Sequence, residues 1–382
     1  MQRLNYFLRC APCWRFPDLL QTYDSTLLSI LEKILNCSFD NYSWNQLSLP
    51  VRRGGFGLRN AVTSAIPSYL ASFHSVLPVV ETLIPEAVLQ NDTSLSAAMQ
   101  QFESKFGPSP VSRRDLQTTW ETPFFDNMLQ TLSDGATTPL AKARLLAVQQ
   151  PESGLWLSAV PSEPLKTHIK DRHFHIISGL RLGAKIVRPH ICCDCGTPVS
   201  SFGVHGLACR KSAGRLSRHS SINDLIARAL RSAEIPTRLE PRGCSDDNKR
   251  PDGVTLIPFD RGLSLAFDAT CVDTYAPSHL PGTSTTPGAA AKQAEADKRR
   301  KYADLADDFL FVPVAVETSG VWGKDALQLI QKIGSRIANI TMDARATNFL
   351  MQRISIAIQH GNAASVLGSF QTGDELLELF LL

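Results

Sequence analysis

Apolar residues in the first part of the chain recur at the three- and four-residue spacing of a helix. One such stripe lies between residues 20 and 34. A second helix is expected after the Gly-rich turn at 54–57, running through Leu70. The region 81–180 keeps the helical pattern, with Pro-rich interruptions at 107–110 and 151–164. We therefore predict a helical N-terminal half. The residues of the first stripe are Leu20, Tyr23, Leu27, Leu28, Leu31 and Ile34.

The pattern changes near residue 185, where short apolar runs separated by turn residues begin. Strands are expected near 235–241, 253–258 and 263–271, and another at 310–316. The runs at 253–258 and 263–271 flank a turn at Asp260-Arg261-Gly262, which is typical of a β-hairpin. A Ser/Thr/Pro/Gly-rich loop at 277–288, a helix at 289–308 and helices to near residue 366 follow. This alternation predicts an α+β or mixed α/β fold for the second half of the chain.

Two acidic residues are expected at one end of this hairpin. Asp252 stands in Pro251-Asp252-Gly253, before the first strand, and Asp268 lies near the end of the second. Their carboxylates should come within about 6 Å and hold Mg²⁺ or Mn²⁺, which prefer oxygen ligands. Like charges at that distance should raise the pKa of at least one of the two acids. The alternative is a Pro-Asp-Gly turn and an unrelated aspartate at a strand end.

Four of the nine cysteines lie between residues 192 and 209, together with one histidine, which favours a metal site over buried thiols or disulfides. Thiolates and imidazole suit structural Zn²⁺, and Gly196 and Gly206 permit the tight turns of a knuckle. Cys192 and Cys193 both have suitable spacing for the first ligand. We predict Cys193, because neighbouring residues of an extended segment face opposite sides. The expected zinc ligands are Cys193, Cys195, His205 and Cys209.

A basic stretch follows the cysteines. Residues 210–242 contain eight Lys or Arg side chains and three acids, although the whole chain has a net charge of only +3. Such an excess after a knuckle indicates a phosphate-binding surface, while a solvated basic helix face is the alternative. The candidate nucleic-acid contacts are Arg210, Lys211, Arg215, Arg218, His219 and Arg250.

These motifs, taken in order, resemble the C-terminal part of non-LTR retrotransposon proteins that carry a restriction-like endonuclease of the PD-(D/E)XK type. The order is the Cys/His knuckle, Arg218-His219, Glu240-Pro241, Arg250-Pro251-Asp252, Asp268 and Lys298-Arg299-Arg300-Lys301-Tyr302. The segment 44–58 is similar to the end of the reverse transcriptase thumb in the same proteins. The resemblance covers most of the chain and is least clear around 90–140.

The resemblance implies a small PD-(D/E)XK-like nuclease core. Its lysine normally stands two residues after the second acid, where this chain has Thr270. The similar retrotransposon endonucleases have a displaced K-x-x-K-Y pattern, so Lys298 or Lys301 is expected to orient the attacking water. Tyr302 is expected to pack beneath that helix. The catalytic residues implied are Asp252, Asp268, Lys298, Lys301 and Glu240, with Arg218 and His219 clamping a phosphate.

The expected organisation has five parts. Residues 1–80 form a thumb-like helical region, 81–184 a helical linker region and 185–215 the zinc knuckle. Residues 216–370 form the endonuclease domain and 371–382 a tail. Tyr302-Ala303-Asp304-Leu305 lacks the second aspartate of a polymerase loop. We therefore expect a fragment without fingers and palm, and without polymerase activity.

The resemblance further implies a nuclear protein that binds DNA, with the RNA of its element as a further candidate partner. No apolar run of eighteen or more residues indicates a membrane span. Three functions follow from the sequence: a Mg²⁺-dependent DNA endonuclease, a nucleic-acid-binding module without catalysis, and an inactive relic of a mobile element. The sequence leaves the target DNA, the host and the oligomeric state open.

Overall fold

The structure is a computed structural model that describes residues 2–35, 39–84, 93–244 and 249–370. The predicted tail at 371–382 lies outside the described residues. The chain divides into two compact units. The first comprises Met1–Ile34, Ser38–Pro50 and Gly55–Gly135, and the second comprises Leu35–Cys37, Val51–Gly54 and Ala136–Leu382. The division at Gly135 falls inside the region that we expected to be a helical linker.

The first unit is helical, as the sequence pattern predicts. Helix α4 packs against α1, α6 and α7. Its start is fixed by Asn60, whose side chain accepts a hydrogen bond from the Thr63 N–H, because a helix N-terminus leaves its first N–H groups unpaired. The helices of this unit are α1 (Gln2–Cys10), η1 (Cys13–Arg15), α2 (Pro17–Leu35), α3 (Asn41–Ser48), α4 (Ala61–Leu83), α6 (Thr93–Phe106) and α7 (Gln117–Gly135).

The predicted stripe of α2 is only partly buried. Leu20 and Leu31 are buried, whereas Ile34 is 61 % exposed. The stripe is wider than the surface that the neighbouring helices cover, so helical spacing alone overestimates the buried face. A small hydrophobic core of the first unit lies around Phe102 and Trp120, whose rings pack edge to face.

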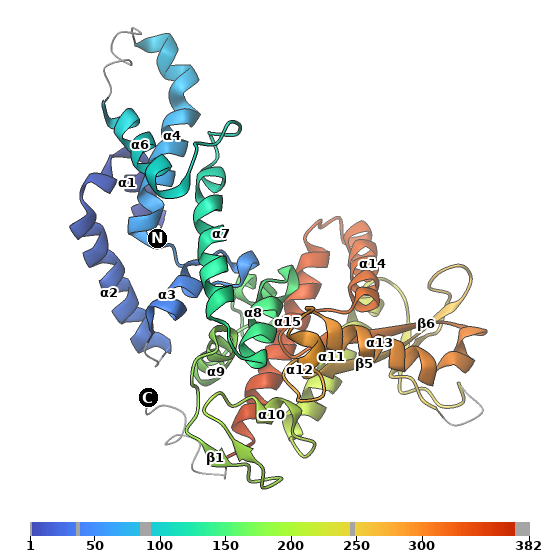
Figure 1. Cartoon of the computed structure of the whole chain (residues 1–382). Coiled ribbons are helices and arrows are strands. Elements are labelled where there is room, and N and C mark those ends of the chain that lie inside the picture. The colour runs from blue at the N-terminus through green and yellow to red at the C-terminus, as the bar shows by residue number, and fades with distance from the viewer. Residues whose placement is uncertain (1, 36–38, 85–92, 245–248, 371–382) are drawn as a thin grey trace. The chain divides into compact units, whose positions relative to one another are not determined.

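The second unit contains the elements expected from residue 185 onward and the helices that precede them (Figure 1). Helix α13 ends at Lys301 rather than at residue 308, and a short helix, α12, interrupts the predicted loop at 277–288. The elements are η2 (Val51–Arg53), α8 (Pro139–Val148), η3 (Pro151–Ser158), α9 (Asp171–Leu182), β1 (His190–Ile191), β2 (Pro198–Val199), α10 (His205–Ala208), α11 (Ala213–Ser232), β3 (Thr237–Leu239), β4 (Gly253–Thr255), β5 (Ser264–Val272), α12 (Leu280–Thr283), α13 (Ala289–Lys301), η4 (Ala303–Ala306), β6 (Phe309–Glu317), α14 (Lys324–Thr341) and α15 (Ala346–Leu367).

The described part of this unit holds a four-stranded sheet in the order β3-β4-β5-β6. Strands β4 and β5 pair antiparallel, which confirms the predicted hairpin, and its turn closes with a bridge between Asp260 and Leu263. Strands β5 and β6 run parallel, with α12 and α13 between them in the chain. Antiparallel and parallel pairs in one sheet, covered by helices, give the mixed α+β architecture that the sequence predicts.

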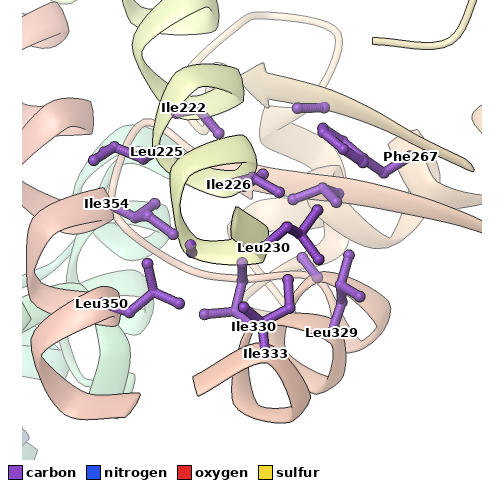
Figure 2. Close-up of a cluster of buried hydrophobic side chains, with 14 of the residues drawn as sticks. Ile222, Leu225, Ile226, Leu230, Phe267, Leu329, Ile330, Ile333, Leu350 and Ile354 are labelled. Carbon is purple, nitrogen blue, oxygen red and sulfur yellow. The ribbon is translucent and has the colours of Figure 1, made fainter. Parts of the chain in front are cut away.

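The core of this unit lies between the sheet and three helices. Figure 2 shows Ile226 and Leu230 of α11 meeting Phe267 of β5, Ile330 of α14 and Ile354 of α15. Apolar residues at spacings of three and four along α11 create this contact face. Helix α13 packs on β5 and β6, so its exposed basic end is held close to the strands.

Among the described residues, no helix is both long enough and apolar enough to cross a membrane.

Candidate functional site

Three cysteines and one histidine converge in the second unit. One sulfur or nitrogen atom from each of Cys192, Cys195, His205 and Cys209 lies within 4.8 Å of the others. Cys195 Sγ lies 3.2 Å from His205 Nε2, and Cys192 Sγ lies 4.0 Å from Cys209 Sγ. Tetrahedral zinc with bonds of about 2.0–2.3 Å requires ligand atoms about 3.3–3.8 Å apart. The donor set is that of a structural zinc site and its atoms lie close to this spacing, so the cluster could hold a zinc ion.

The local fold brings these ligands together. Strands β1 and β2 pair on either side of a turn in which the Gly196 N–H donates to the Cys192 carbonyl at 2.8 Å. Gly196 has φ +73°, a backbone conformation that glycine adopts without strain. His205 opens the one-turn helix α10, and Cys209 follows its end. The sequence pattern of the ligands is thus C-x2-C-x9-H-x3-C.

The prediction of Cys193 as a ligand was wrong. Cys193 is exposed, and its thiol donates to the Phe370 carbonyl at 3.0 Å. The segment 192–195 is a turn rather than an extended strand, so the two residues of a C-x-x-C pair face the same side. Cys192 is buried and takes the ligand position. Hydrogen bonds from the hydroxyl and from the backbone of Thr197, of which the hydroxyl has the larger effect, lower the pKa of the Cys195 thiol to about 6. The lowered pKa favours the thiolate that binds metal.

The two predicted acids lie opposite each other across the hairpin. Gly253 pairs with Phe267 in the β4–β5 register, so Asp252 and Asp268 occupy the next pair of opposed positions. The Ala269 N–H also donates to Asp252 Oδ2 at 2.7 Å. A side chain at position 253 would collide with the Phe267 ring, so glycine beside Asp252 permits this close approach. Asp268 lies within β5, and not at the strand end that we expected.

Helix α13 supplies cationic and hydroxyl partners to Asp268. Lys298 forms an ion pair with Asp268 Oδ2. The buried Tyr302 hydroxyl lies 2.8 Å from Asp268 Oδ1 and 2.8 Å from the Arg250 carbonyl. Burial and the nearby Asp268 raise the pKa of Tyr302, so its hydroxyl stays protonated. Lys301 donates to this hydroxyl at 2.9 Å. The expectation that a lysine of this helix reaches the acids is therefore met in geometry by Lys298.

His219 of α11 pairs with the other acid. Its Nε2 lies 3.2 Å from Asp252 Oδ1, and this hydrogen bond raises the pKa of His219. Burial acts to raise the pKa of Asp252, but the hydrogen bond and charge of His219 and the Ala269 N–H outweigh it and lower that pKa. Our expectation of a raised pKa was thus wrong for Asp252, because it considered the two acids without their partners.

Two buried glutamates hold α13 in place. Glu317, at the end of β6, accepts hydrogen bonds from the Ala290 and Ala291 N–H groups at the start of α13. Glu295, inside α13, accepts from the Asp325 and Ala326 N–H groups at the start of α14. These carboxylates satisfy helix N-termini, and Glu317 is fully buried in this role. No local sequence pattern indicates this role, because the capped N–H groups lie more than twenty residues away.

Other predicted catalytic residues have different surroundings. The Glu240 side chain is 67 % exposed and pairs with Arg250 at 2.7 Å. The Lys301 ammonium contacts the hydroxyl and ring of Tyr302. Arg218 is buried, and its guanidinium donates to Asn362 Oδ1 at 2.7 Å. The prediction that Arg218 clamps a phosphate of bound nucleic acid was therefore wrong, because a basic helix carries a core-facing side as well.

All the predicted nucleic-acid contacts except Arg250, which pairs with Glu240, line a cavity of about 460 Å³. It extends from Arg210 and Lys211, directly after Cys209, to His219 and Thr270. Arg215 lines it too and donates to the Ala208 carbonyl, linking the basic helix to the Cys/His cluster. Thr270, two residues after Asp268 on β5, also lines this cavity. This cavity, lined by residues 210–219 and 270–271, is called the basic groove below.

No known protein-family model matches the sequence, and no curated protein matches it.

Proposed function

We propose that the chain is a metal-dependent DNA endonuclease that hydrolyses a phosphodiester bond. The observation that carries this proposal is the placement of Asp252 and Asp268 on opposed positions of the β4–β5 hairpin, with Lys298 of α13 on Asp268. Paired carboxylates with a lysine are typical of sites that bind a divalent cation and orient a water beside it.

Asp252 and Asp268 would hold Mg²⁺ or Mn²⁺. All four carboxylate oxygens already have partners, yet each oxygen has a second lone pair available to a cation. When bound, the cation supplies stabilisation of negative charge on the phosphate. Tyr302 fixes the orientation of Asp268, and Lys298 presents an N–H donor to a water or phosphate oxygen at the same place. Lys298 is thus the candidate catalytic lysine, and Lys301 acts through Tyr302.

The basic groove supports DNA as the substrate. Arg210, Lys211 and Arg215 line it, and His219 joins it to Asp252. A phosphate chain neutralised along these residues would pass the acids. Zinc at the Cys192, Cys195, His205 and Cys209 cluster would hold the start of the groove in place.

The retrotransposon assignment rests on the ordered motifs of the sequence. The restriction-like PD-(D/E)XK type, a nuclear location and binding of element RNA are proposed on the same motifs. The mixed sheet, with the acids on an antiparallel hairpin and the lysine on the helix before the parallel strand, is compatible with them.

A nucleic-acid-binding module without catalysis is the second candidate. Lys298 and His219 neutralise both acids, which would let the basic groove bind phosphates while no cation enters. This function requires the basic groove alone.

Nicking of supercoiled DNA in the presence of Mg²⁺ separates the two functions. Asp252→Ala should reduce nicking by at least about 100-fold, while salt-sensitive DNA binding stays close to that of the parent chain. Asp260→Asn is the matched control, since Asp260 is an acid on the turn of the same hairpin and pairs with Lys332. Undiminished nicking by Asp252→Ala would rule out this site as the catalyst. Binding without nicking by the parent chain would favour the second candidate.

A further inference from the structure

Helix α11 borders a second cavity on the side away from the acids. Its residues Ser217, Ser221, Asp224 and Arg228 line a cavity of about 300 Å³. Their spacing places them on one face of the helix, and His219, two residues after Ser217, points to the opposite face. Helix α15 and the segment around α9 form the other walls. Arg218 lines both this cavity and the basic groove, but the other lining residues differ, and neither Asp252 nor Asp268 lines this cavity.

Positive charge is in excess around this cavity. Lys166 and Arg353 line it, and neither has a carboxylate partner within the described ranges of the chain. Arg228 lines it as well, paired with Asp224 at 2.9 Å. The buried Arg218 borders it, and its Nε has no hydrogen-bond partner among the described residues. Unneutralised guanidinium and ammonium groups around one hollow are suited to an anion with several oxygens, such as a phosphate.

Two histidines form a hydrogen-bonded pair at the same cavity. His173 Nδ1 lies 3.0 Å from His360 Nδ1, so one nitrogen carries the proton and the other accepts it. Burial is the main cause that lowers the pKa of both rings, and the charge of Lys170 lowers it further, although a hydrogen bond with the His168 backbone acts to raise that of His360. The lowered pKa favours the neutral form of each ring. Neutral imidazoles offer both donors and acceptors and can hydrogen-bond the edge of a heterocycle.

Apolar side chains form another part of the lining. They are Leu165, Leu225, Ile356 and Ala357, which come from the same segments as the charged residues. A hollow of about 300 Å³ with an apolar wall and a few polar groups is at the lower end of the range for small-molecule sites. The apolar side chains suit a flat ring, while the cations suit a charged group attached to it.

We propose that this cavity binds a nucleotide, with its phosphate at Lys166, Arg228 and Arg353 and its base against the apolar wall beside His173 and His360. The shared chemistry is a phosphate joined to a planar heterocycle. Its source is either a free mononucleotide or the end of a single strand. The inference does not rest on the proposed nuclease activity, because the cavity and the acids lie on opposite sides of α11.

Calorimetric titration of the full chain with dAMP tests the proposal. Deoxyadenosine and inorganic phosphate, which each present half of the ligand, should bind at least about 10-fold more weakly than dAMP. Arg353→Gln should weaken dAMP binding by about 10-fold or more, since it removes a charge-assisted hydrogen bond. Lys166→Gln, on an exposed residue, is the second variant and keeps the test valid if Arg353→Gln fails to fold.

Arg345→Gln is the matched control, because Arg345 precedes α15, is 87 % exposed and pairs with Asp343 outside the cavity. It should leave dAMP binding unchanged, as should Asp252→Ala. Competition with a short 5′-phosphorylated oligonucleotide identifies the source: displacement of dAMP assigns a strand end, and failure to displace it assigns a free nucleotide. Absence of dAMP binding, equal binding of phosphate alone, or unchanged binding in both Arg353→Gln and Lys166→Gln would overturn the proposal.

Discussion

The Cys/His cluster and the carboxylate pair are both candidate metal centres, but they differ in the secondary structure and packing that surround them. The cluster joins segments that have little else in common: a turn between two two-residue strands and a one-turn helix. The acids lie on the sheet beside the main hydrophobic core and have hydrogen-bond or ionic partners from three elements.

This difference is typical of two kinds of metal site: at the Cys/His cluster the metal would stabilise the fold, and at the carboxylate pair it would take part in a reaction. Short elements that bury few apolar residues need metal bonds to stay folded. A site on a sheet beside a packed core keeps its shape without the ion, so its residues are free to act on a ligand. The predictions below test that contrast, beginning with the largest effect.

Removing zinc should unfold the region of the cluster. A strong chelator, or Cys192→Ser, is expected to lower the melting temperature of the second unit by at least about 10 °C, because metal binding contributes directly to folding in such knuckles. Differential scanning calorimetry with and without added Zn²⁺ measures this. Cys193→Ser is the matched control and should melt like the parent chain. If Cys193→Ser were the damaging variant, the ligand set Cys192, Cys195, His205 and Cys209 would be incorrect.

Lys298→Ala should reduce nicking by about 100-fold or more, since a positioned proton-transfer or orienting group contributes at least that much. Steady-state nicking with Mg²⁺ is the measurement. Lys301→Ala is the matched control on the same helix, and its effect should be smaller because Lys301 contacts Tyr302 and not an acid. Equal losses for both lysines would mean that the basic end of α13 acts on DNA as a whole.

Tyr302→Phe should act on the position of Asp268 rather than on chemistry. The variant loses the hydrogen bond that the hydroxyl donates to Asp268 or the Arg250 carbonyl, and the one that it accepts from Lys301, each worth about 1 kcal/mol of unfolding free energy. Nicking should then fall by about 10-fold, with the loss reduced at high Mn²⁺ concentration, since more cation compensates a weakened site. Urea denaturation and nicking at several Mn²⁺ concentrations measure the two effects. A loss of nicking that Mn²⁺ does not change would contradict a positioning role.

Glu317 should give the smallest effect, visible in the pH dependence of stability. Burial raises the pKa of Glu317 above its usual value. A raised pKa in the folded state means that this group stabilises the fold at low pH, and that the contribution is lost as pH rises through the folded pKa. The difference in unfolding free energy between the parent chain and Glu317→Gln should therefore fall as the pH is raised from near the ordinary pKa of glutamate to above the pKa of Glu317 in the folded protein. Urea denaturation of both proteins across this pH range is the measurement, and a pH-independent difference would contradict it.

The sequence predicted the local features of the fold well. The hairpin around Asp260, the strand at 310–316 and the basic helix after the cysteines all appear in the structure, because each depends on short-range periodicity and turn residues. The opposed positions of Asp252 and Asp268 also followed from the hairpin alone. The sequence did not correctly predict the direction in which individual side chains point, as Cys193 and Arg218 show.

Contacts between segments that are far apart in the chain could not be predicted from the sequence. His219 pairs with an acid 33 residues away, and Glu317 caps a helix that begins 28 residues earlier. The His173–His360 pair joins positions 187 residues apart. No spacing rule connects such positions, since the tertiary packing of α11, α13 and α15 brings them together.

The cysteine-bearing turn also holds the far end of α15. The Cys193 N–H donates to the Ser369 carbonyl, and the His190 ring stacks on Phe370. Contacts between segments so distant in sequence close a very large loop, which makes them slow to form during folding. Residues 190–209 are synthesised long before residue 369. The Cys/His cluster could therefore bind its metal before α15 has been synthesised and packed against it. Completion of the second unit would thus be a late event, controlled by the arrival of α15 rather than by zinc.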